Sequence, residues 1–297
     1  MTKDTPQVAI ITRTKDRPLF LERAIQSIHN QTMHDFVHVI INDAGDPMLV
    51  NKLVEKYKEL IADRVEVIHN AESHGMESAS NKAIKSVKSI YVTIHDDDDT
   101  WHPEFLERTT RLLNEQDAMG VVVRADKIVE EVVDTESRIR ELKVAPWMPS
   151  LKVINLYRQC IDNQMTPITF IYRRNAFEAI GYYDETLPVL GDWDFGIRFI
   201  MKYDVEFLDP GFALANYHHR TYKPGVEGNT SYAGNDMARY YTNLLMNKYL
   251  RQELADGRLG VGYIMSKLRY DQSNLSAMAR RLLPAFVVSR LKKRIQS

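Results

Sequence analysis

Four consecutive aspartates, Asp96 to Asp99, are the residues whose type and spacing most directly indicate chemistry in this sequence. Adjacent carboxylates repel one another, so keeping all four ionised is costly unless a cation or solvent compensates their charge. Mg²⁺ and Mn²⁺ take oxygen ligands and leave coordination positions for phosphate groups, so the run predicts a divalent-metal site that holds a diphosphate. The alternative is an exposed acidic turn before the helix expected to begin near Pro103, although a helix N-terminus requires one acidic residue and not four.

A second polar group is the run Tyr217-His218-His219-Arg220, at the end of an expected strand. Histidines at such a place complete metal sites with carboxylates, so His218 and His219 are candidate metal ligands. Either histidine taken singly also fits an ordinary structural role. Arg220 and Lys223 are candidates to hold a diphosphate. We expect the glycine-rich segment 220–235 to be a mobile loop that closes over a donor and excludes water.

Strand and helix patterns alternate through the first third of the chain, which predicts βαβ units and a mostly parallel sheet. Asn42-Asp43 and the aspartate run both follow expected strands, and ligands bind at the carboxyl ends of strands in open α/β sheets. We therefore expect the two acidic loops to share one crevice. The expected strands are 8–12, 36–41, 65–68 and 89–94, and the expected helices start at 18 or span 49–61, 78–87 and 103–113.

The remainder of the chain is less regular. Residues 120–133 resemble β structure, and 134–166 give no definite pattern. Further strands are expected at 167–172, 205–208 and 212–217, and helices at 173–180 and 193–203. The pattern is helical from 236 onward, so we predict a catalytic domain over 1–235 and a C-terminal helical appendage over 236–297.

Four ordered motifs together resemble the family 2 glycosyltransferases with a GT-A fold. The motifs are Val8 to Pro18, Asn30-Gln31-Thr32, Ile41 to Gly45, and Ile94 to Asp99 followed by Trp101 and Pro103. The resemblance implies an α/β, Rossmann-like domain that binds a nucleotide-sugar. It also implies a metal-dependent, inverting transferase of the hexosyltransferase type, with a UDP-sugar favoured as donor and a hydroxyl as acceptor. By analogy we expect a role in bacterial surface polysaccharide synthesis.

The resemblance also implies roles for matching positions on the donor side. Arg13, Thr14 and Asp16 would border the nucleotide, and Asp43 would read the base. Asp96 to Asp98 would bind ribose and metal, with Asp98 and Asp96 as metal ligands beside the two histidines. The expected cofactor is Mn²⁺ or Mg²⁺.

The segment Leu190 to Phe195 is similar to the acceptor side of the family, where an acidic pair precedes a helix and its second member is the base. Asp192 matches this base, and Gly191 stands where the first acidic residue is expected. A carboxylate placed opposite the leaving diphosphate takes the proton of the acceptor hydroxyl. Trp193 and Asp194 are then candidate acceptor-binding residues. The alternative is helix capping, with Asp192 as N-cap and Asp194 in the first turn.

Composition limits the other classes of function. The formal net charge of −1 gives no support to nucleic-acid binding. A single cysteine, Cys160, suits a reducing compartment, and no signal peptide or run of about 20 apolar residues is visible, so we expect a cytoplasmic protein. The basic, amphipathic segment 277–297 would contact anionic lipid beside a lipid-linked glycan acceptor, or would dock on the core or on a partner subunit.

Two other functions fit part of the same pattern. A metal-dependent nucleotidyltransferase also binds phosphates through acidic residues, but it is expected to have a glycine-rich phosphate loop early in the chain, and residues 12–18 contain no glycine. A catalytically silent module that binds a nucleotide-sugar or a glycan is favoured only by Gly191.

Overall fold

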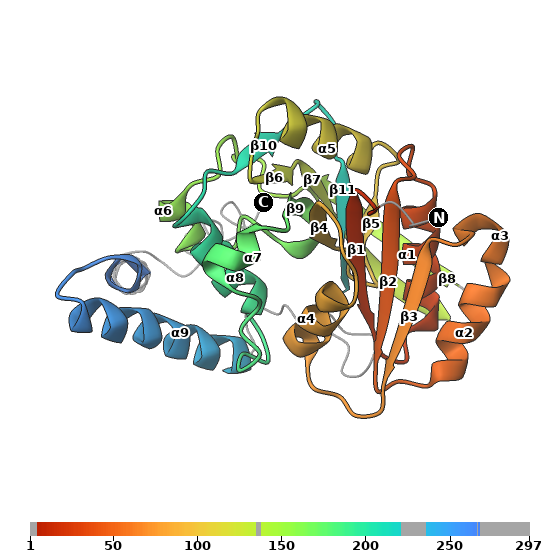
Figure 1. Ribbon diagram of the computed structural model, residues 1–297, viewed down its shortest axis with the longest axis horizontal. Coiled ribbons are helices and arrows are strands. Elements are labelled where there is room, and N and C mark those ends of the chain that lie inside the picture. The colour runs from red at the N-terminus through yellow and green to blue at the C-terminus, as the bar shows by residue number, and fades with distance from the viewer. Residues whose placement is uncertain (1–4, 135–137, 221–235, 266, 268–297) are drawn as a thin grey trace, which may run out of the picture.

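The computed structural model describes residues 5–134, 138–220, 236–265 and 267. Its main sheet has seven strands in the order β10-β6-β9-β4-β1-β2-β3 (Figure 1). All neighbouring pairs are parallel except those of β9, which runs antiparallel to β4 and β6. The prediction of a mostly parallel α/β sheet is therefore confirmed. The strands are β1 Val8–Thr14, β2 Phe36–Asp43, β3 Val65–Asn70, β4 Tyr91–Ile94, β6 Gly120–Val123, β9 Phe170–Arg173 and β10 Glu206–Leu208.

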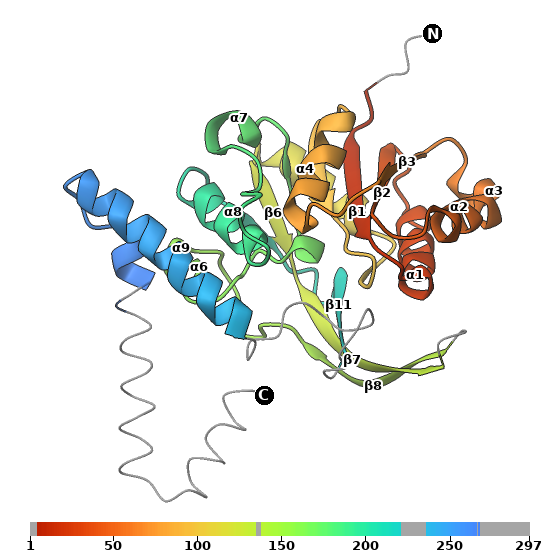
Figure 2. The same cartoon turned by 90° about the horizontal axis from the view of Figure 1, so that it is seen from below.

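Helices cover both faces of this sheet, because successive strand residues point to opposite sides. On β1, Val8 and Ile10 pack with helices α1 and α5, whereas Ala9 and Ile11 pack with α4 and α8. Helices α2 and α3 extend the first layer, and α7 belongs to the second (Figure 2). The helices are α1 Pro18–His29, α2 Pro47–Lys56, α3 Lys58–Ile61, α4 Met76–Ser86, α5 Phe105–Glu115, α6 Leu156–Gln159, α7 Ala176–Ile180 and α8 Gly191–Ile200.

A second, four-stranded sheet has the order β5-β11-β7-β8, with bounds β5 Thr100–Trp101, β7 Ala125–Asp134, β8 Arg138–Pro146 and β11 Ala215–Arg220. In it β11 pairs in parallel with β7 and antiparallel with β5. Because β5 follows the aspartate run directly, this pairing carries the residues of β11 to the run. Two segments more than 100 residues apart in the sequence thus meet at one place.

The β structure expected over 120–133 is present as two strands, β6 and β7, that belong to different sheets. Two other expected boundaries are wrong. The helix expected over 49–61 is divided at Tyr57 into α2 and α3. The strand expected from Pro167 begins only at Phe170, after a 3₁₀ turn, because proline has no N–H to donate to a strand ladder.

Helix α9, Asp236–Ala255, packs beside the helix that carries Asp192. Its Leu245 and Tyr249 share a core cluster with Trp193 and Ile197 of α8. The predicted boundary at 235 stays a prediction, and the basic segment 277–297 and residues 221–235 of the glycine-rich segment lie outside the described residues. Within the part of the chain that the structure describes, no helix is long and apolar enough to cross a membrane.

Candidate active site

The aspartate run lies at the carboxyl end of β4; Asp96 is half-buried and the other three aspartates are buried. Asp97, Asp98 and Asp99 expose 2%, 7% and 2% of their surface. An acidic turn in solvent would expose its carboxylates, so the alternative of an exposed turn is wrong. The run is instead part of an enclosed polar cluster.

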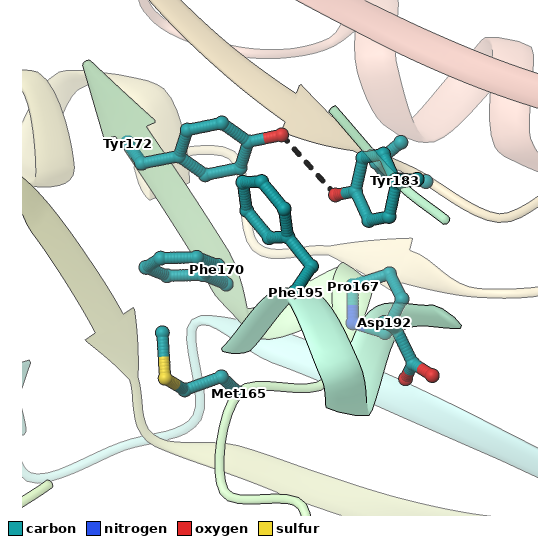
Figure 3. A pocket seen from close by; sticks show the side chains of 8 residues that line it. Met165, Pro167, Phe170, Tyr172, Tyr183, Asp192 and Phe195 are labelled. Atoms are coloured by element: carbon teal, nitrogen blue, oxygen red, sulfur yellow. Dashed lines mark hydrogen bonds between the residues drawn. The ribbon is translucent and has the colours of Figure 1, made fainter. Parts of the chain in front are cut away.

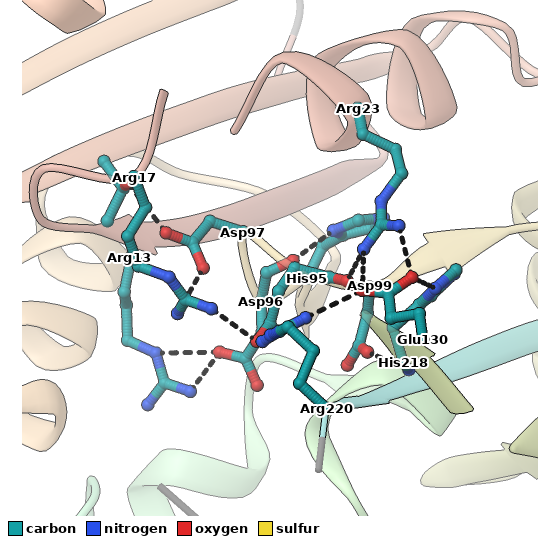
Figure 4. Close-up of polar contacts among 12 residues, drawn as sticks. Arg13, Arg17, Arg23, His95, Asp96, Asp97, Asp99, Glu130, His218 and Arg220 are labelled. Atoms are coloured by element: carbon teal, nitrogen blue, oxygen red, sulfur yellow. Dashed lines mark hydrogen bonds and ion pairs between the residues drawn. The ribbon is translucent and has the colours of Figure 1, made fainter. Parts of the chain in front are cut away.

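Three arginines from two distant segments neutralise this cluster (Figure 4). Arg13, at the end of β1, forms an ion pair with Asp96 and donates to it through Nε at 3.2 Å. Arg17, just before α1, lies 2.9 Å from Asp97 and 2.7 Å from Asp98. Arg220, at the end of β11, also pairs with Asp98. Guanidinium groups thus provide part of the charge compensation that the four aspartates require.

The pKa values of the run follow from burial and from these pairs. Burial alone would raise the pKa of Asp98, but Arg17 and Arg220 hold it well below its ordinary value. Burial raises the pKa of Asp97 to about 7 against the effect of Arg17, and burial with the neighbouring Asp98 charge raises that of Asp99. Asp98 is therefore the firmly ionised member, which is the property that a metal or phosphate-organising site requires.

His218 does not present a free ring nitrogen to the run. Its Nδ1 lies 2.7 Å from Glu130 Oε2, its Nε2 lies 2.9 Å from Thr100 Oγ1, and its backbone N–H donates to Asp99 at 2.7 Å. His219 follows on the same strand, so its side chain points to the other face of the sheet. Within the described ranges, no group of three or more His, Cys, Asp or Glu side chains is arranged to hold a metal ion. The predicted ligand set of Asp96, Asp98, His218 and His219 is not assembled here.

Glu130 is a buried member of the cluster that sequence reasoning missed. It is fully buried on β7, and it binds Arg23 at 2.7 Å and Arg220 at 2.8 Å in addition to His218. Burial opposes its ionisation, but hydrogen bonds from His218 and Arg23 lower its pKa to about 2. Glu130 therefore fixes the cations of the cluster, and no local pattern in its strand could have indicated this.

The residues expected to border the nucleotide link neighbouring strand ends. Thr14 donates to Asp97 at 2.8 Å. Asp16, at φ 54°, accepts from the backbone N–H of Asp46 at 2.6 Å and so ties the loop after β1 to the loop after β2. Thr14 and Arg13 are thus in the cluster, whereas Asp16 lies beside the next loop. Lys223 lies outside the described residues.

Asp43, at the end of β2, organises the loop that precedes α4. Its carboxylate accepts from Asn70 at 2.8 Å and Ser73 at 2.6 Å, and from the backbone N–H groups of His74 and Gly75 at 3.3 Å each. Burial opposes ionisation, but these hydrogen bonds lower its pKa overall. The carboxylate expected to read the base therefore also holds the loop before α4 in place.

We expect Asp43→Ala to lower the free energy of unfolding at pH 7 by about 1–3 kcal/mol, because it leaves buried donors without their acceptor. The folded-state pKa is depressed, so this stabilisation is present above the ordinary aspartate value of 3.8 and is lost as the pH falls through the folded-state pKa. Urea unfolding of wild type and variant between pH 7 and 3 measures the gap between their free energies of unfolding. Glu72→Ala, in the same loop and exposed, is the matched control. A gap that stayed constant down to pH 3 would contradict this assignment.

Asp192 lies in the first turn of α8 and lines a pocket with Tyr172, Tyr183 and Phe195 (Figure 3). Its Oδ2 accepts from Asn163 at 2.7 Å. Burial raises its pKa although Arg13 opposes the rise. The helix N-cap is Leu190 and has no side-chain cap, so the alternative of Asp192 as N-cap is wrong. Its carboxylate instead accepts from Asn163 and, in Figure 3, points away from the aromatic side chains that line the pocket.

The next two residues of α8 point elsewhere, because each residue turns the helix by about 100°. Trp193 exposes 6% of its surface and donates its indole N–H to the carbonyl of Gln159 at 2.5 Å. Asp194 is fully buried and accepts from Arg198 at 2.7 Å and from Tyr249 at 3.0 Å. The prediction that Trp193 and Asp194 bind the acceptor is not supported, since both side chains serve the packing of α8 against α6 and α9.

Gly191 leaves room for a glutamate from another helix. A Cβ at position 191 would lie 2.5 Å from Oε1 of Glu77 and 2.6 Å from its Cγ, closer than real contacts allow. Glu77 exposes 4% of its surface in the first turn of α4. The place where the sequence lacks an acidic residue is therefore occupied by a carboxyl group from elsewhere in the chain.

We expect Gly191→Ala to destabilise the protein by about 1–3 kcal/mol, as overpacking of a filled site does. In a Glu77→Ala background the same change should cost close to nothing, because its obstacle is gone. Urea unfolding of the wild type, both single variants and the double variant measures this coupling. Additive effects of the two substitutions would show that the side chains do not compete for one space.

Comparisons with known proteins identify the family and the fold of this chain. A model of Glycosyl transferase family 2 matches residues 9–181. The uncharacterized glycosyltransferase YwdF of Bacillus subtilis is 26% identical over 205 residues, which are 67% of this chain and 70% of YwdF. The putative colanic acid biosynthesis glycosyl transferase WcaA of Escherichia coli is 25% identical over 205 residues, 68% of either chain.

Among solved structures, S. aureus TarS 1–349 in complex with UDP-GlcNAc is similar, with a TM-score of 0.63 and 18% identity over 82% of this chain. The chain spans 66% of that structure's length, and the likeness shows a shared GT-A fold. The family model covers more than half of the 297 residues and includes the strand ends that carry Arg13, Asp43 and the aspartate run. The chain therefore belongs to glycosyltransferase family 2.

Proposed function

We propose that the protein is an inverting glycosyltransferase that moves a sugar from a nucleotide-diphosphate sugar to an acceptor hydroxyl. The observation that carries the proposal is a pair of distinct polar centres joined by one side chain. Arg13 binds Asp96 of the charged cluster, and its charge also acts on Asp192 at the pocket. One centre is suited to a diphosphate and the other to proton transfer.

The donor diphosphate would lie at the cluster, against Arg13, Arg17 and Arg220. Guanidinium groups bind phosphate through paired hydrogen bonds, and they would release carboxylates when they do so. A UDP-sugar is the favoured donor, because the structurally similar TarS was solved with UDP and with UDP-GlcNAc. We propose that Asp43 and the loop it organises form the nucleotide side of the site.

The carboxylates of the cluster fit a divalent ion if the substrate supplies its remaining ligands. Mg²⁺ in enzymes commonly uses one or two carboxylates and completes its shell with substrate phosphates and water. Asp98, which is firmly ionised, and Asp96, two residues before it, are the oxygen ligands we propose. A bound Mn²⁺ or Mg²⁺ would stabilise negative charge on the departing diphosphate. The fit depends on substrate oxygens, since the described protein side chains alone do not complete a shell.

The transfer itself is a single displacement. The acceptor hydroxyl oxygen forms a bond to the anomeric carbon on the face opposite the diphosphate, and the bond from that carbon to the diphosphate oxygen breaks. The proton of the hydroxyl passes to Asp192, whose pKa is raised by burial, so that it is a stronger base than an ordinary aspartate. Arg17 and Arg220 are placed to hold the charge of the leaving nucleoside diphosphate.

The descriptions of two relatives support a role in surface polysaccharide synthesis. WcaA is described as a putative colanic acid enzyme, and TuaG of B. subtilis, 27% identical over 116 residues, as a putative teichuronic acid enzyme. We propose a glycan or lipid-linked glycan acceptor in surface polysaccharide synthesis, at the cytoplasmic face of the membrane. Residues 1–235 would be the catalytic domain and 236–297 a helical appendage.

Release of nucleoside diphosphate from a panel of nucleotide sugars, with Mn²⁺ and candidate glycan acceptors, tests the proposal. We expect one sugar nucleotide to be turned over faster with its acceptor than without it. Nucleotide binding with no turnover on any acceptor would favour the silent binding module, and absence of nucleotide binding would contradict a transferase.

A further inference from the structure

Glu77 is a buried acidic residue that the proposed mechanism does not use. It exposes 4% of its surface, and within the described part of the chain its Oε2 is buried and has no hydrogen-bond partner. The guanidinium of Arg13 lies 3.9 Å from that oxygen, at the outer limit of an ion pair. A buried carboxyl oxygen without a partner is costly, so its retention at a site calls for a ligand group.

The position of Glu77 relates it to both centres of the site. Its carboxyl group fills the space beside Gly191, the residue directly before Asp192. On its other side stands Arg13, which binds Asp96 of the charged cluster. Glu77 therefore lies between the proposed diphosphate side and the proposed base.

Its protonation state favours hydrogen-bond donation. Burial raises the pKa of Glu77 to about 8 despite the opposing charge of Arg13, and the negative charges of Asp192 and Asp96 add to the rise. The carboxyl group is therefore mostly neutral at pH 7 and carries a proton that it can donate.

We propose that Glu77 binds a hydroxyl group of the sugar that is transferred, a role that rests on the proposed function. In a direct displacement the sugar ring lies between the leaving diphosphate and the base, because the two bonds at the anomeric carbon point in opposite directions. A side chain between Arg13 and Asp192 meets the ring at that place. Helix α4 thus provides a sugar contact that α8 lacks at position 191.

Calorimetric binding of UDP and of three UDP-sugars, UDP-glucose, UDP-galactose and UDP-GlcNAc, tests this role. For the UDP-sugar that wild type binds best, we expect Glu77→Ala to weaken binding by about tenfold, the value of one hydrogen bond. Binding of UDP itself should change less than twofold. Glu77→Gln should stay within about threefold of wild type, since its amide still donates.

Glu185→Ala is the matched control, because Glu185 also contacts α4, by accepting from Asn81 at 2.8 Å, and is exposed. It should leave both affinities unchanged. Equal weakening of UDP and UDP-sugar in Glu77→Ala would show a structural role, and no change in either would show no role, so each result overturns the proposal. A wild type that binds no nucleotide is a different observation, which would remove the proposed function itself.

Discussion

Asp192→Asn is expected to lower kcat by roughly 100-fold to 10,000-fold, the range that loss of a general base produces. The amide keeps the size of the side chain and can still accept from Asn163, but it cannot take a proton from the acceptor. Affinity for the free nucleoside diphosphate should stay within about twofold of wild type, since Asp192 belongs to the pocket and not to the charged cluster. Steady-state kinetics and calorimetry on the same samples provide both numbers.

Asp194→Asn separates catalysis from helix packing. Asp194 lies two residues further along α8 and is held by Arg198 and Tyr249. This variant should unfold at a lower temperature but retain a near-normal kcat for its folded fraction. The wild-type rate should also fall on acidification through the pKa of Asp192, which burial places above the ordinary value of 3.8. Equal losses of kcat in both variants would contradict the assignment of Asp192 as base.

Asp98→Ala is expected to abolish the effect of Mn²⁺ on nucleotide binding. In wild type we expect Mn²⁺ to strengthen UDP binding by roughly 100-fold or more, consistent with several kcal/mol of charge stabilisation by a metal ion. The variant loses the firmly ionised ligand, and Arg17 and Arg220 each lose one of their carboxylate partners, while Arg17 keeps Asp97 and Arg220 keeps Glu130. Its affinities with Mn²⁺ and with EDTA should therefore be nearly equal.

Asp99→Asn is the control for this variant. Burial raises the pKa of Asp99, so asparagine resembles its protonated form, and an oxygen remains to accept from the backbone N–H of His218. The Mn²⁺ effect should survive in this variant. An Asp98→Ala protein that still bound UDP more tightly with Mn²⁺ would exclude Asp98 as the essential ligand.

Much of the fold could be predicted from local periodicity. The strands β1, β2 and β4 are short runs rich in apolar and β-branched residues and are buried on both faces. The helices between them have apolar residues at helical spacing, and the strand ends carry the predicted acidic loops. Strand β8 was not predicted, because it is exposed along most of its length and so has no alternation of apolar and polar residues. Strand β9 lies between β4 and β6 and is antiparallel to both. The order of strands in a sheet could not be predicted, because the local sequence of a strand does not specify its neighbours.

The site was predicted less completely, because its members pair across long separations. Arg23 with Glu130 and Glu77 with Gly191 are each about 100 residues apart, and only the strand register and helix docking bring them together. The sequence itself sets one limit on the predicted metal site. His218 and His219 are adjacent in an expected strand, so their side chains point to opposite faces and do not serve one metal ion together.

Calorimetric titration of the wild type with UDP, GDP, CDP and ADP, each with Mn²⁺ and with EDTA, tests the central claim most directly. The account predicts tight binding of one nucleoside diphosphate, UDP, that depends strongly on Mn²⁺. Absence of binding to all four under both conditions would contradict a nucleotide-sugar site, and it would leave the arginine and aspartate cluster as a purely structural feature of the fold.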